Sequence, residues 1–479
     1  MSFMDIFNER ADVKTTENGA FAYKSTGTAV LDFFAVVGGM RKRPEKDIVD
    51  MFLAARQEDK ELADKIVLYS RDIRGAGLGE RRIGKILLRA LATVDTPKVI
   101  RNFDTFVSLG RFDDLYVLEG TPAETAMWNY IRETFLNDLK AMKEGKPISL
   151  AAKWMKSINT SSKESKRIAR KFCTIAGVTE RTYRKTLAAL RKYSNVVEVK
   201  MSANEWDTIN FEAVPSVAMK RYAKAFDRHC PNAFTKFKAD VESGDAKINS
   251  STLYPYDITY SFLYGGNADK EILESQWKAL PNYFKEGRNV VCCADVSGSM
   301  CGMPMAASIG LALYCARFNT GAYHGSYLTF TDQPRFFKFD ETQSLEWNIK
   351  QCTRKVGYNT NLDGMLQEIF RIASMEMDAP EALLIVSDCE IDRFAWDSSC
   401  YEDIVQKWVK KYRSIGLECP KIIFWNCDAR QNTFLSRHTN PYVSFVSGVS
   451  AGTFANLSQL IDMSPVEAMI EILNQYKFV

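Results

Sequence analysis

The segment Asn289-Val-Val-Cys-Cys-Ala-Asp-Val-Ser-Gly-Ser299 shows most directly how the C-terminal part of this chain folds. Its first six residues, Asn289 to Ala294, form a short apolar run that favours a buried β-strand. A carboxylate and two hydroxyls follow at alternate positions, Asp295, Ser297 and Ser299. The segment therefore predicts a strand that ends in a loop of oxygen donors.

Further apolar runs suited to strands follow this segment, and helical stretches with apolar residues three and four apart separate them. The strands are expected at Ser326 to Phe330, Ala382 to Ser387, Lys421 to Trp425 and Tyr442 to Val446. The helices are expected at Met305 to Phe318, Leu362 to Ala373, Tyr401 to Ile415 and Ser464 to Tyr476. This alternation predicts a doubly wound, mainly parallel α/β sheet, which binds ligands beyond the carboxyl ends of its strands.

Two later residues would complete a cation site in the loop of oxygen donors. Thr360 would add a hydroxyl from Gly357-Tyr-Asn-Thr-Asn361, and Asp388 would add a carboxylate after the strand at 382–387. Oxygen donors of this kind suit Mg²⁺, which keeps several waters where the protein supplies few charges. Glu390 and Asp392 follow closely, so the ligand from this last loop stays open. The alternative is that these residues only cap loops.

The set Asp295, Ser297, Ser299, Thr360 and Asp388 resembles the metal-ion-dependent adhesion site of von Willebrand factor A (vWA) domains. In that site D-x-S-x-S, a distant Thr and a later Asp hold a divalent ion. The resemblance implies a vWA domain over residues 287–479, with Mg²⁺ or another divalent cation as cofactor. It also implies that one position on the ion stays open for an acidic group of a partner.

Residues 1–286 contain a series of amphipathic helices with short connections, and few segments alternate with period two. Helices are expected at Ile48 to Arg56, Ala63 to Arg71, Arg82 to Leu91 and Ala126 to Met142, with glycines between them. No unit repeats clearly, so a HEAT-like helical solenoid is inferred from the serial helices alone. The fold class is therefore α followed by α/β, with domains at 1–286 and 287–479.

Positive charge is concentrated in one stretch of the helical part. Residues 151–200 hold 13 Lys+Arg and 3 Glu, a net charge of +10, in a chain whose net charge is only +4. Ser161-Ser-Lys-Glu164 predicts the start of one helix, and a second begins near Glu180. Each would bury one apolar face and present its cations outward. The candidate RNA-binding residues are Lys153, Lys156, Lys163, Lys166, Arg167, Arg170, Lys171, Arg181, Arg184, Lys185, Arg191 and Lys192.

These cations can bind nucleic acid because each Lys or Arg that neutralises a phosphate releases counterions. Exposed aromatics such as Trp154 or Tyr183 could also stack on single-stranded bases, although Tyr183 falls on the apolar face of its helix. The alternative is that the charge run is only a solvated surface.

Cysteine and histidine usage and the start of the chain limit the other possibilities. The 11 cysteines are scattered, which favours free thiols in a reducing compartment, and C-x-x-C pairs are absent. With only 3 histidines, a zinc finger or a His-centred triad has little to build on. No long apolar run predicts a membrane span, and Met1 to Arg10 is unlike a signal peptide, so the expected location is cytoplasmic.

Several motifs together resemble the TROVE family, named for telomerase, Ro and vault proteins, and in particular a Ro-like branch of uncharacterised plant, bacterial and phage proteins. They are Arg71-Asp-Ile-Arg-Gly-Ala-Gly-Leu-Gly-Glu-Arg81, Gly110-Arg-Phe-Asp-Asp114, Leu150-Ala-Ala-Lys-Trp154, Asn159-Thr-Ser-Ser162 and Pro215-Ser-Val-Ala-Met219. The resemblance implies a ring of helical repeats closed by the vWA domain. It implies a basic outer surface for small structured noncoding RNAs and a central hole for single-stranded ends of misfolded RNA.

The sequence therefore predicts a non-catalytic RNA-binding protein, and two other functions stay open. One is an adaptor whose metal site recruits an acidic protein partner. The other is a Mg²⁺-dependent phosphatase with Asp295 as nucleophile, which lacks the usual second acid because position 297 is Ser. Gly75-Ala-Gly-Leu-Gly79 does not match a dinucleotide loop and is expected to be a turn between helices.

Overall fold

The structure, a computed structural model, describes residues 12–194, 196–266, 268–284, 287–330, 334–354, 360–392 and 401–479. Most of the stretch Gly357–Asn361 and the start of the chain lie outside these residues. The chain forms two compact units. One contains Met1–Ile83 and Ser250–Lys477, and the other contains Gly84–Asn249 and Phe478–Val479. The change from helices to alternating strands near residue 286 lies within the first unit, and the division into domains at that point stays a prediction.

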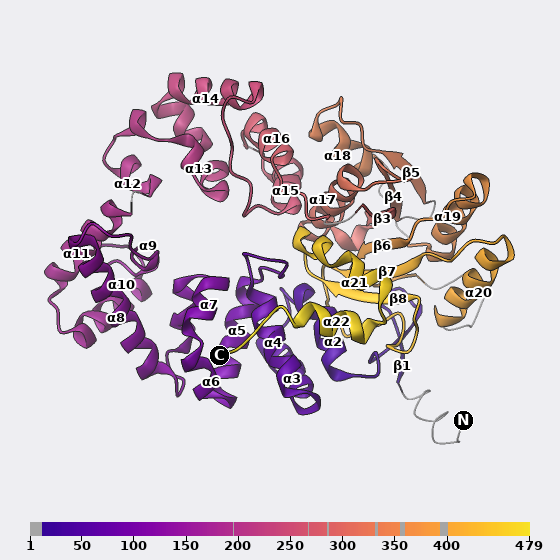
Figure 1. The fold of residues 1–479 in the computed structure, drawn as a ribbon, viewed down its shortest axis with the longest axis horizontal. Helices are drawn as coiled ribbons and strands as arrows, with labels where there is room; N and C mark the ends of the chain where they lie inside the picture. Colours follow the sequence, from indigo (N-terminus) through magenta and orange to yellow (C-terminus); the bar gives the residue numbers. More distant parts are fainter. Residues whose placement is uncertain are drawn as a thin grey trace. The chain divides into compact units, whose positions relative to one another are not determined.

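A mixed six-stranded sheet forms the centre of the first unit, with strand order β5-β4-β3-β6-β7-β8 (Figure 1). The five strands predicted from the sequence are β3 (Val290–Asp295), β4 (Ser326–Phe330), β6 (Ala382–Ser387), β7 (Lys421–Asn426) and β8 (Val443–Ser447). They pair in parallel, and every residue of β3, β6, β7 and β8 is buried. The edge strand β5 (Arg335–Lys338) is antiparallel to β4 and was not predicted, because only four residues form it.

Helices cover the sheet as expected for strands that are buried on both faces. α17 (Met303–Phe318) packs against β3, β4 and β6, and it is apolar nearly all round because it also packs against α15 (Pro255–Tyr264). The other helices of this part are α16 (Lys270–Lys278), α18 (Leu345–Thr353), α19 (Leu362–Glu376), α20 (Tyr401–Ser414), α21 (Leu457–Asp462) and α22 (Pro465–Leu473). The predicted helices are confirmed at 303–318, 362–376, 401–414 and 465–473.

The N-terminal segment belongs to the same unit as the sheet, which the sequence did not predict. It contains the hairpin of β1 (Val13–Thr15) and β2 (Phe21–Tyr23), followed by α2 (Ala29–Val36), α3 (Glu45–Glu58) and α4 (Lys60–Arg71). α2 packs on the edge strand β8 and also contacts α22. Gly38 lies so close to the backbone of Gly448 that a Cβ atom there would be 2.6 Å from the Gly448 nitrogen. The N-terminal helices therefore complete the core beside β8.

The second unit is helical, as predicted. Its elements are most of α5 (Arg81–Val94), then α6 (Thr96–Arg101), α7 (Phe103–Leu109), α8 (Glu124–Lys143), α9 (Ala151–Trp154), α10 (Lys163–Ala176), α11 (Glu180–Tyr193), α12 (Val197–Ser202), α13 (Ser216–His229) and α14 (Pro231–Ser243). Ser162 caps α10 by accepting a hydrogen bond from the Ser165 nitrogen, and Gly177 ends α10 with a φ of +65°.

Two further expectations concern cysteines and membranes. The 10 cysteines within the described ranges are all free thiols, and eight of them are buried. In the same ranges, no helix is both long and apolar enough to span a membrane.

Candidate cation site and cationic surface

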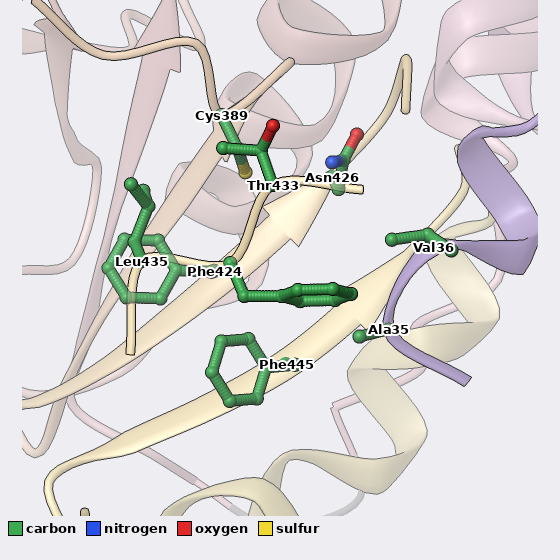
Figure 2. Close-up of a pocket in the computed structure, with 9 residues that line it drawn as sticks. Ala35, Val36, Cys389, Phe424, Asn426, Thr433, Leu435 and Phe445 are labelled. Carbon is green, nitrogen blue, oxygen red and sulfur yellow. The ribbon is translucent and has the colours of Figure 1, made fainter. Parts of the chain in front are cut away.

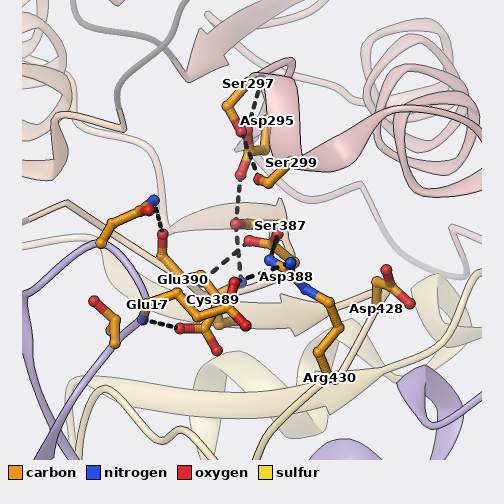
Figure 3. A network of polar contacts seen from close by, with 12 residues as sticks. Glu17, Asp295, Ser297, Ser299, Ser387, Asp388, Cys389, Glu390, Asp428 and Arg430 are labelled. Atoms are coloured by element: carbon orange, nitrogen blue, oxygen red, sulfur yellow. Dashed lines mark hydrogen bonds and ion pairs between the residues drawn. The ribbon is translucent and has the colours of Figure 1, made fainter. Parts of the chain in front are cut away.

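Asp295 is fully buried at the carboxyl end of the central strand β3 (Figure 3). The register pairs Ala294 with Val386, so Asp295 lies beside Ser387 on β6. One carboxylate oxygen of Asp295 accepts from the Ser297 nitrogen at 2.9 Å, and the other accepts from the Ser387 hydroxyl at 2.6 Å. Burial, followed by the nearby charge of Asp388, raises the pKa of Asp295 to about 7. A cation beside Asp295 would oppose both effects.

The hydroxyls of Ser297 and Ser299 lie together next to this carboxylate. Their Oγ atoms are 3.2 Å apart, and Ser299 is exposed whereas Ser297 is buried. Two adjacent ligands in an octahedron with bonds of about 2.1 Å are roughly 3 Å apart, so this spacing suits one shared Mg²⁺. The predicted D-x-S-x-S loop thus places its oxygen atoms where a cation could bind from solvent.

Asp388 follows β6 and carries the second predicted carboxylate, but an internal cation already binds it. Arg430 donates to an Asp388 oxygen at 2.7 Å and also pairs with Glu17 at 2.9 Å (Figure 3). The other oxygen of Asp388 accepts from the Glu390 nitrogen at 3.1 Å. Arg430 therefore neutralises the carboxylate that a divalent ion would use.

Thr360 hydrogen-bonds to Asp392, an acid that comes later in the same loop as Asp388. Its hydroxyl accepts from the Asp392 nitrogen at 3.0 Å, and its own nitrogen donates to an Asp392 carboxylate oxygen at 2.5 Å. Thr360 is thereby tied to the loop after β6, four residues beyond Asp388. The structure brings Asp295, Ser297 and Ser299 together and places Asp388 directly after the neighbouring strand, whereas the hydrogen bonds of Thr360 go to Asp392.

The N-terminal hairpin packs against this same loop. The Glu17 nitrogen donates to a Glu390 carboxylate oxygen at 2.6 Å, and the Asn18 side chain donates to the Glu390 carbonyl at 2.6 Å. The Thr16 hydroxyl donates to the Ile391 carbonyl at 2.7 Å. Glu390 is thus held by the N-terminal turn, and burial raises its pKa.

Across the described ranges, no group of three or more His, Cys, Asp or Glu side chains is arranged to hold a metal. A divalent ion would therefore depend on the Ser297 and Ser299 hydroxyls and on water, with Asp295 and Asp388 supplying charge. A nearby cavity lined by Cys389, Phe424 and Phe445 measures only about 10 Å³, which suits at most one water molecule (Figure 2). It is not a ligand site.

In the second unit, α11 carries a continuous stripe of cations, which we call the α11 stripe. Arg181, Arg184, Lys185 and Lys192 share one face of the helix because they are spaced by three, four and seven residues. All four are exposed, and none has an ion-pair partner among the described residues. The opposite face is buried, as predicted, by Tyr183, Leu187 and Leu190, so the helix is fixed with its cations outward.

Most of the remaining predicted RNA contacts have partners within the protein. Arg167 pairs with Glu119 and Glu164, and Lys171 pairs with Glu119 at 2.7 Å. The hydrogen bonds from Arg167, with those from Lys171, lower the pKa of Glu119 to about 2. Arg170 pairs with Glu180 at 3.0 Å. Only Lys163 and Lys166 of α10 have no ion-pair partner within the described part of the chain.

Arg191 differs from its prediction most clearly, because it faces inward. Its guanidinium donates to the Ala152 carbonyl at 2.9 Å, the Met155 carbonyl at 2.7 Å and the Ser157 hydroxyl at 2.8 Å. Burial lowers its pKa. These bonds tie α11 to the end of α9, so Arg191 is a structural residue.

The cations near α9 are also engaged. Lys156 lies 3.7 Å from Asp113, and the guanidinium of Arg111 stacks 3.5 Å from the centre of the half-buried Trp154 ring. Lys153 lies 5.5 Å from the same ring. One face of Trp154 is therefore already covered, which leaves less of it for a base than the sequence suggested.

The motif Arg71–Arg81 forms the predicted turn between α4 and α5. Asp72 accepts from the nitrogens of Arg74 and Gly75 at 2.7 and 3.0 Å, and from the Tyr476 hydroxyl at 2.9 Å. Arg71 and Glu80 are buried. The motif fixes a loop against the C-terminal part of the same unit through Asp72 and Tyr476, while Arg74 and Arg81 stay exposed on its surface.

Sequence reasoning missed Arg430, Ser387 and the N-terminal turn at 16–19. Ser387 ends a predicted strand and could have been suspected from its place beside Asp295. Arg430 and Glu17 come from distant loops without a motif, and no local signal indicates their contact.

Two family models each match a part of this chain. A domain of unknown function (DUF2828) matches residues 160–287, and another (DUF7788) matches residues 289–462. An uncharacterised protein of Acanthamoeba polyphaga mimivirus is 28% identical over 97% of this chain and 88% of its own length. The crystal structure of the Deinococcus radiodurans Ro (RSR) protein is similar at 12% identity, over 94% of this chain and 100% of that chain, with a TM-score of 0.37.

Proposed function

We propose that this chain is a non-catalytic, cytoplasmic RNA-binding protein of the Ro type, in which a HEAT-like helical body binds RNA and a vWA domain contacts a partner through a divalent cation. The observation that carries the RNA proposal is the α11 stripe. Four exposed cations, which pair with no acid of the described residues, extend over about 16 Å of helix at 1.5 Å per residue. An acidic polymer is the ligand that such a stripe suits best.

Of the predicted RNA contacts, the cations of the α11 stripe are already exposed and would break no ion pair within the described residues when they bind RNA. Arg181, Arg184, Lys185 and Lys192 would contact phosphates directly, and Lys163 and Lys166 on the neighbouring helix α10 would add to them. Arg167, Arg170 and Lys171 would first have to leave Glu119, Glu164 and Glu180, which reduces their contribution. The ligands are a small structured noncoding RNA, single-stranded ends of misfolded RNA, or both.

The test is RNA binding by fluorescence anisotropy over a range of salt concentrations, with a labelled RNA hairpin that carries a single-stranded 3′ end. Replacing the four cations of the α11 stripe by Gln should weaken binding and reduce the salt slope by about 3, since each phosphate contact contributes roughly 0.7 to 0.9. The matched control replaces Arg167, Arg170 and Lys171 by Gln and should change the slope much less. An unchanged affinity and slope in the stripe variant would show that RNA does not bind there.

The cation proposal rests on the spacing of the Ser297 and Ser299 hydroxyls beside the buried Asp295. A bound Mg²⁺ would supply a positive centre with an open position for an acidic group. Titration with Mn²⁺, followed by electron paramagnetic resonance, should show one site that Ser297→Ala weakens. Arg430→Gln should tighten it several-fold, because that variant frees Asp388. If neither variant changes Mn²⁺ binding, the cation does not use this loop.

An adaptor role is the second candidate, favoured by the exposure of Ser299 at the rim of the site. It predicts a protein partner that is retained in Mg²⁺ after nuclease treatment and lost in EDTA. RNA binding predicts nucleic acid that copurifies instead. The two roles use different residues, so each can be removed without the other.

A further inference from the structure

A second site lies in the first unit, away from the residues considered above. A cavity of about 520 Å³ is bounded by α15, α16, α17, α18 and residues 339–346. Binding pockets for small molecules usually measure about 300 to 1,000 Å³. Its lining combines aromatic rings with charged side chains, as such pockets commonly do.

Two cations on this lining have no acidic partner. Arg317 donates to the carbonyls of Trp277 and Lys278 at 2.6 and 2.8 Å, which fixes the guanidinium at the end of α16. Among the residues that the structure describes, no carboxylate lies within ion-pair distance of Arg317 or Lys278. A guanidinium held by carbonyls keeps its full charge, so an anion beside it would be attracted.

The aromatic part of the lining includes a polar group without a partner. Trp277 is 3% exposed, and its indole N–H donates to no atom of the described residues. The Trp277 and Phe339 rings lie 6.5 Å apart between centroids, and both line the cavity. The N–H is itself covered by neighbouring atoms, so a ligand in the cavity would meet Trp277 through its ring.

Most acids on the lining are already engaged. Glu346 pairs with Lys270 at 2.7 Å and with Lys350 at 2.8 Å. Glu274 accepts from the Leu345 nitrogen at 2.8 Å, which caps α18, and Glu271 also has contacts of its own. Glu341 is exposed and is the acid whose field acts on Arg317. The charge that is not engaged in ion pairs beside Arg317 is therefore positive. On the described part of the lining, Glu341 is the single carboxylate that acts against it.

We propose that this cavity binds a small aromatic anion, whose carboxylate or phosphate pairs with Arg317 and Lys278 while its ring packs against Trp277 and Phe339. The proposal is independent of RNA binding and of the cation site. It names the class of ligand by its chemistry: a planar ring and one anionic group.

The test is isothermal titration of the full chain with 1-naphthyl phosphate, 1-naphthoate and neutral 1-naphthol. At least one anion should bind with a 1:1 ratio and at least ten-fold more tightly than 1-naphthol, and the better anion identifies the charged group. Trp277→Phe keeps a smaller ring and should weaken binding roughly five-fold, since an aromatic contact contributes about 1 kcal/mol. Glu341→Gln, at an exposed position, should tighten it.

Arg317→Gln should weaken binding at least ten-fold, whereas the control Arg371→Gln, on α19 outside the lining, should leave it unchanged. If Arg317→Gln does not fold, Trp277→Phe and Glu341→Gln decide, since the first keeps an aromatic ring in the core and the second changes an exposed side chain. The proposal is overturned if no anion binds stoichiometrically, if 1-naphthol binds as well, or if both deciding variants bind as the wild type does.

Discussion

Replacing Arg191 tests whether a cation of the basic stretch is structural or a contact for RNA. The Arg191 guanidinium makes three hydrogen bonds to two carbonyls and a hydroxyl around α9, at 2.7 to 2.9 Å. Arg191→Ala would leave those acceptors without a donor at a half-buried position. A hydrogen bond to a charged group contributes about 1.5 to 3 kcal/mol, and partial solvation reduces this value. We therefore expect Arg191→Ala to lower the free energy of unfolding by about 3 kcal/mol in all.

The neighbouring Lys192 is the matched control because it is exposed and has no ion-pair partner in the described ranges. Lys192→Ala should change the free energy of unfolding by less than about 0.5 kcal/mol. Arg191→Lys should lose most of the stability that Arg191→Ala loses, since an ammonium cannot reproduce the planar fork that reaches three acceptors. The comparison separates the geometry of the guanidinium from its charge.

The assay is urea unfolding followed by circular dichroism, together with hydrogen exchange at the amides of α9 and α11. The exchange data localise the effect to the unit that contains Gly84–Asn249. RNA binding should show the opposite order of effects. Lys192→Ala should reduce the salt slope of the RNA affinity more than Arg191→Ala does. A stability loss below 0.5 kcal/mol in Arg191→Ala would refute the structural role.

Two further outcomes follow from the N-terminal part of the first unit. Asp32 is buried and accepts from the Thr26 nitrogen and hydroxyl, and burial raises its pKa from 3.8 to about 6. A raised folded pKa means that the stability from this group is present below pH 4 and is lost as pH rises through 6. The unfolding free energy of Asp32→Asn minus that of the wild type, measured in urea from pH 4 to 8, should therefore increase up to about pH 6 and then level off; a constant difference would contradict this. Gly38→Ala should lower the melting temperature markedly, because the new Cβ would meet the Gly448 nitrogen at 2.6 Å and backbone atoms cannot move aside cheaply. Gly145→Ala, with no neighbour within 4 Å but a φ of +70°, should cost only about 1 kcal/mol, and equal effects in the two variants would argue against the clash.

Local patterns allowed most elements of the sheet region to be predicted from the sequence. β4 and β6 occupy the predicted residues, because buried parallel strands are short apolar runs between helices. The edge strand β5 and the hairpin of β1 and β2 were not predicted, since strands of only three or four residues are too short to carry a periodic signal.

The candidate site could be predicted only as far as one loop defines it. Asp295, Ser297 and Ser299 lie close in sequence, and the structure places their oxygen atoms together. The ion pair of Arg430 with Asp388 depends on the fold, as does the inward orientation of Arg191. Helical spacing identified the outer faces of α10 and α11, but not Glu119, which lies on an earlier segment and binds two of the α10 cations.

The position of Gly38 against Gly448 has a consequence for how the chain folds as it is synthesised. More than 400 residues separate these two glycines, so the first unit cannot close until the ribosome has produced the chain as far as Gly448. The helices between Gly84 and Asn249 can form their own contacts long before that moment. Until then, the side of α2 that packs on β8 and α22 has no partner, so this apolar surface of the nascent chain is open to a chaperone.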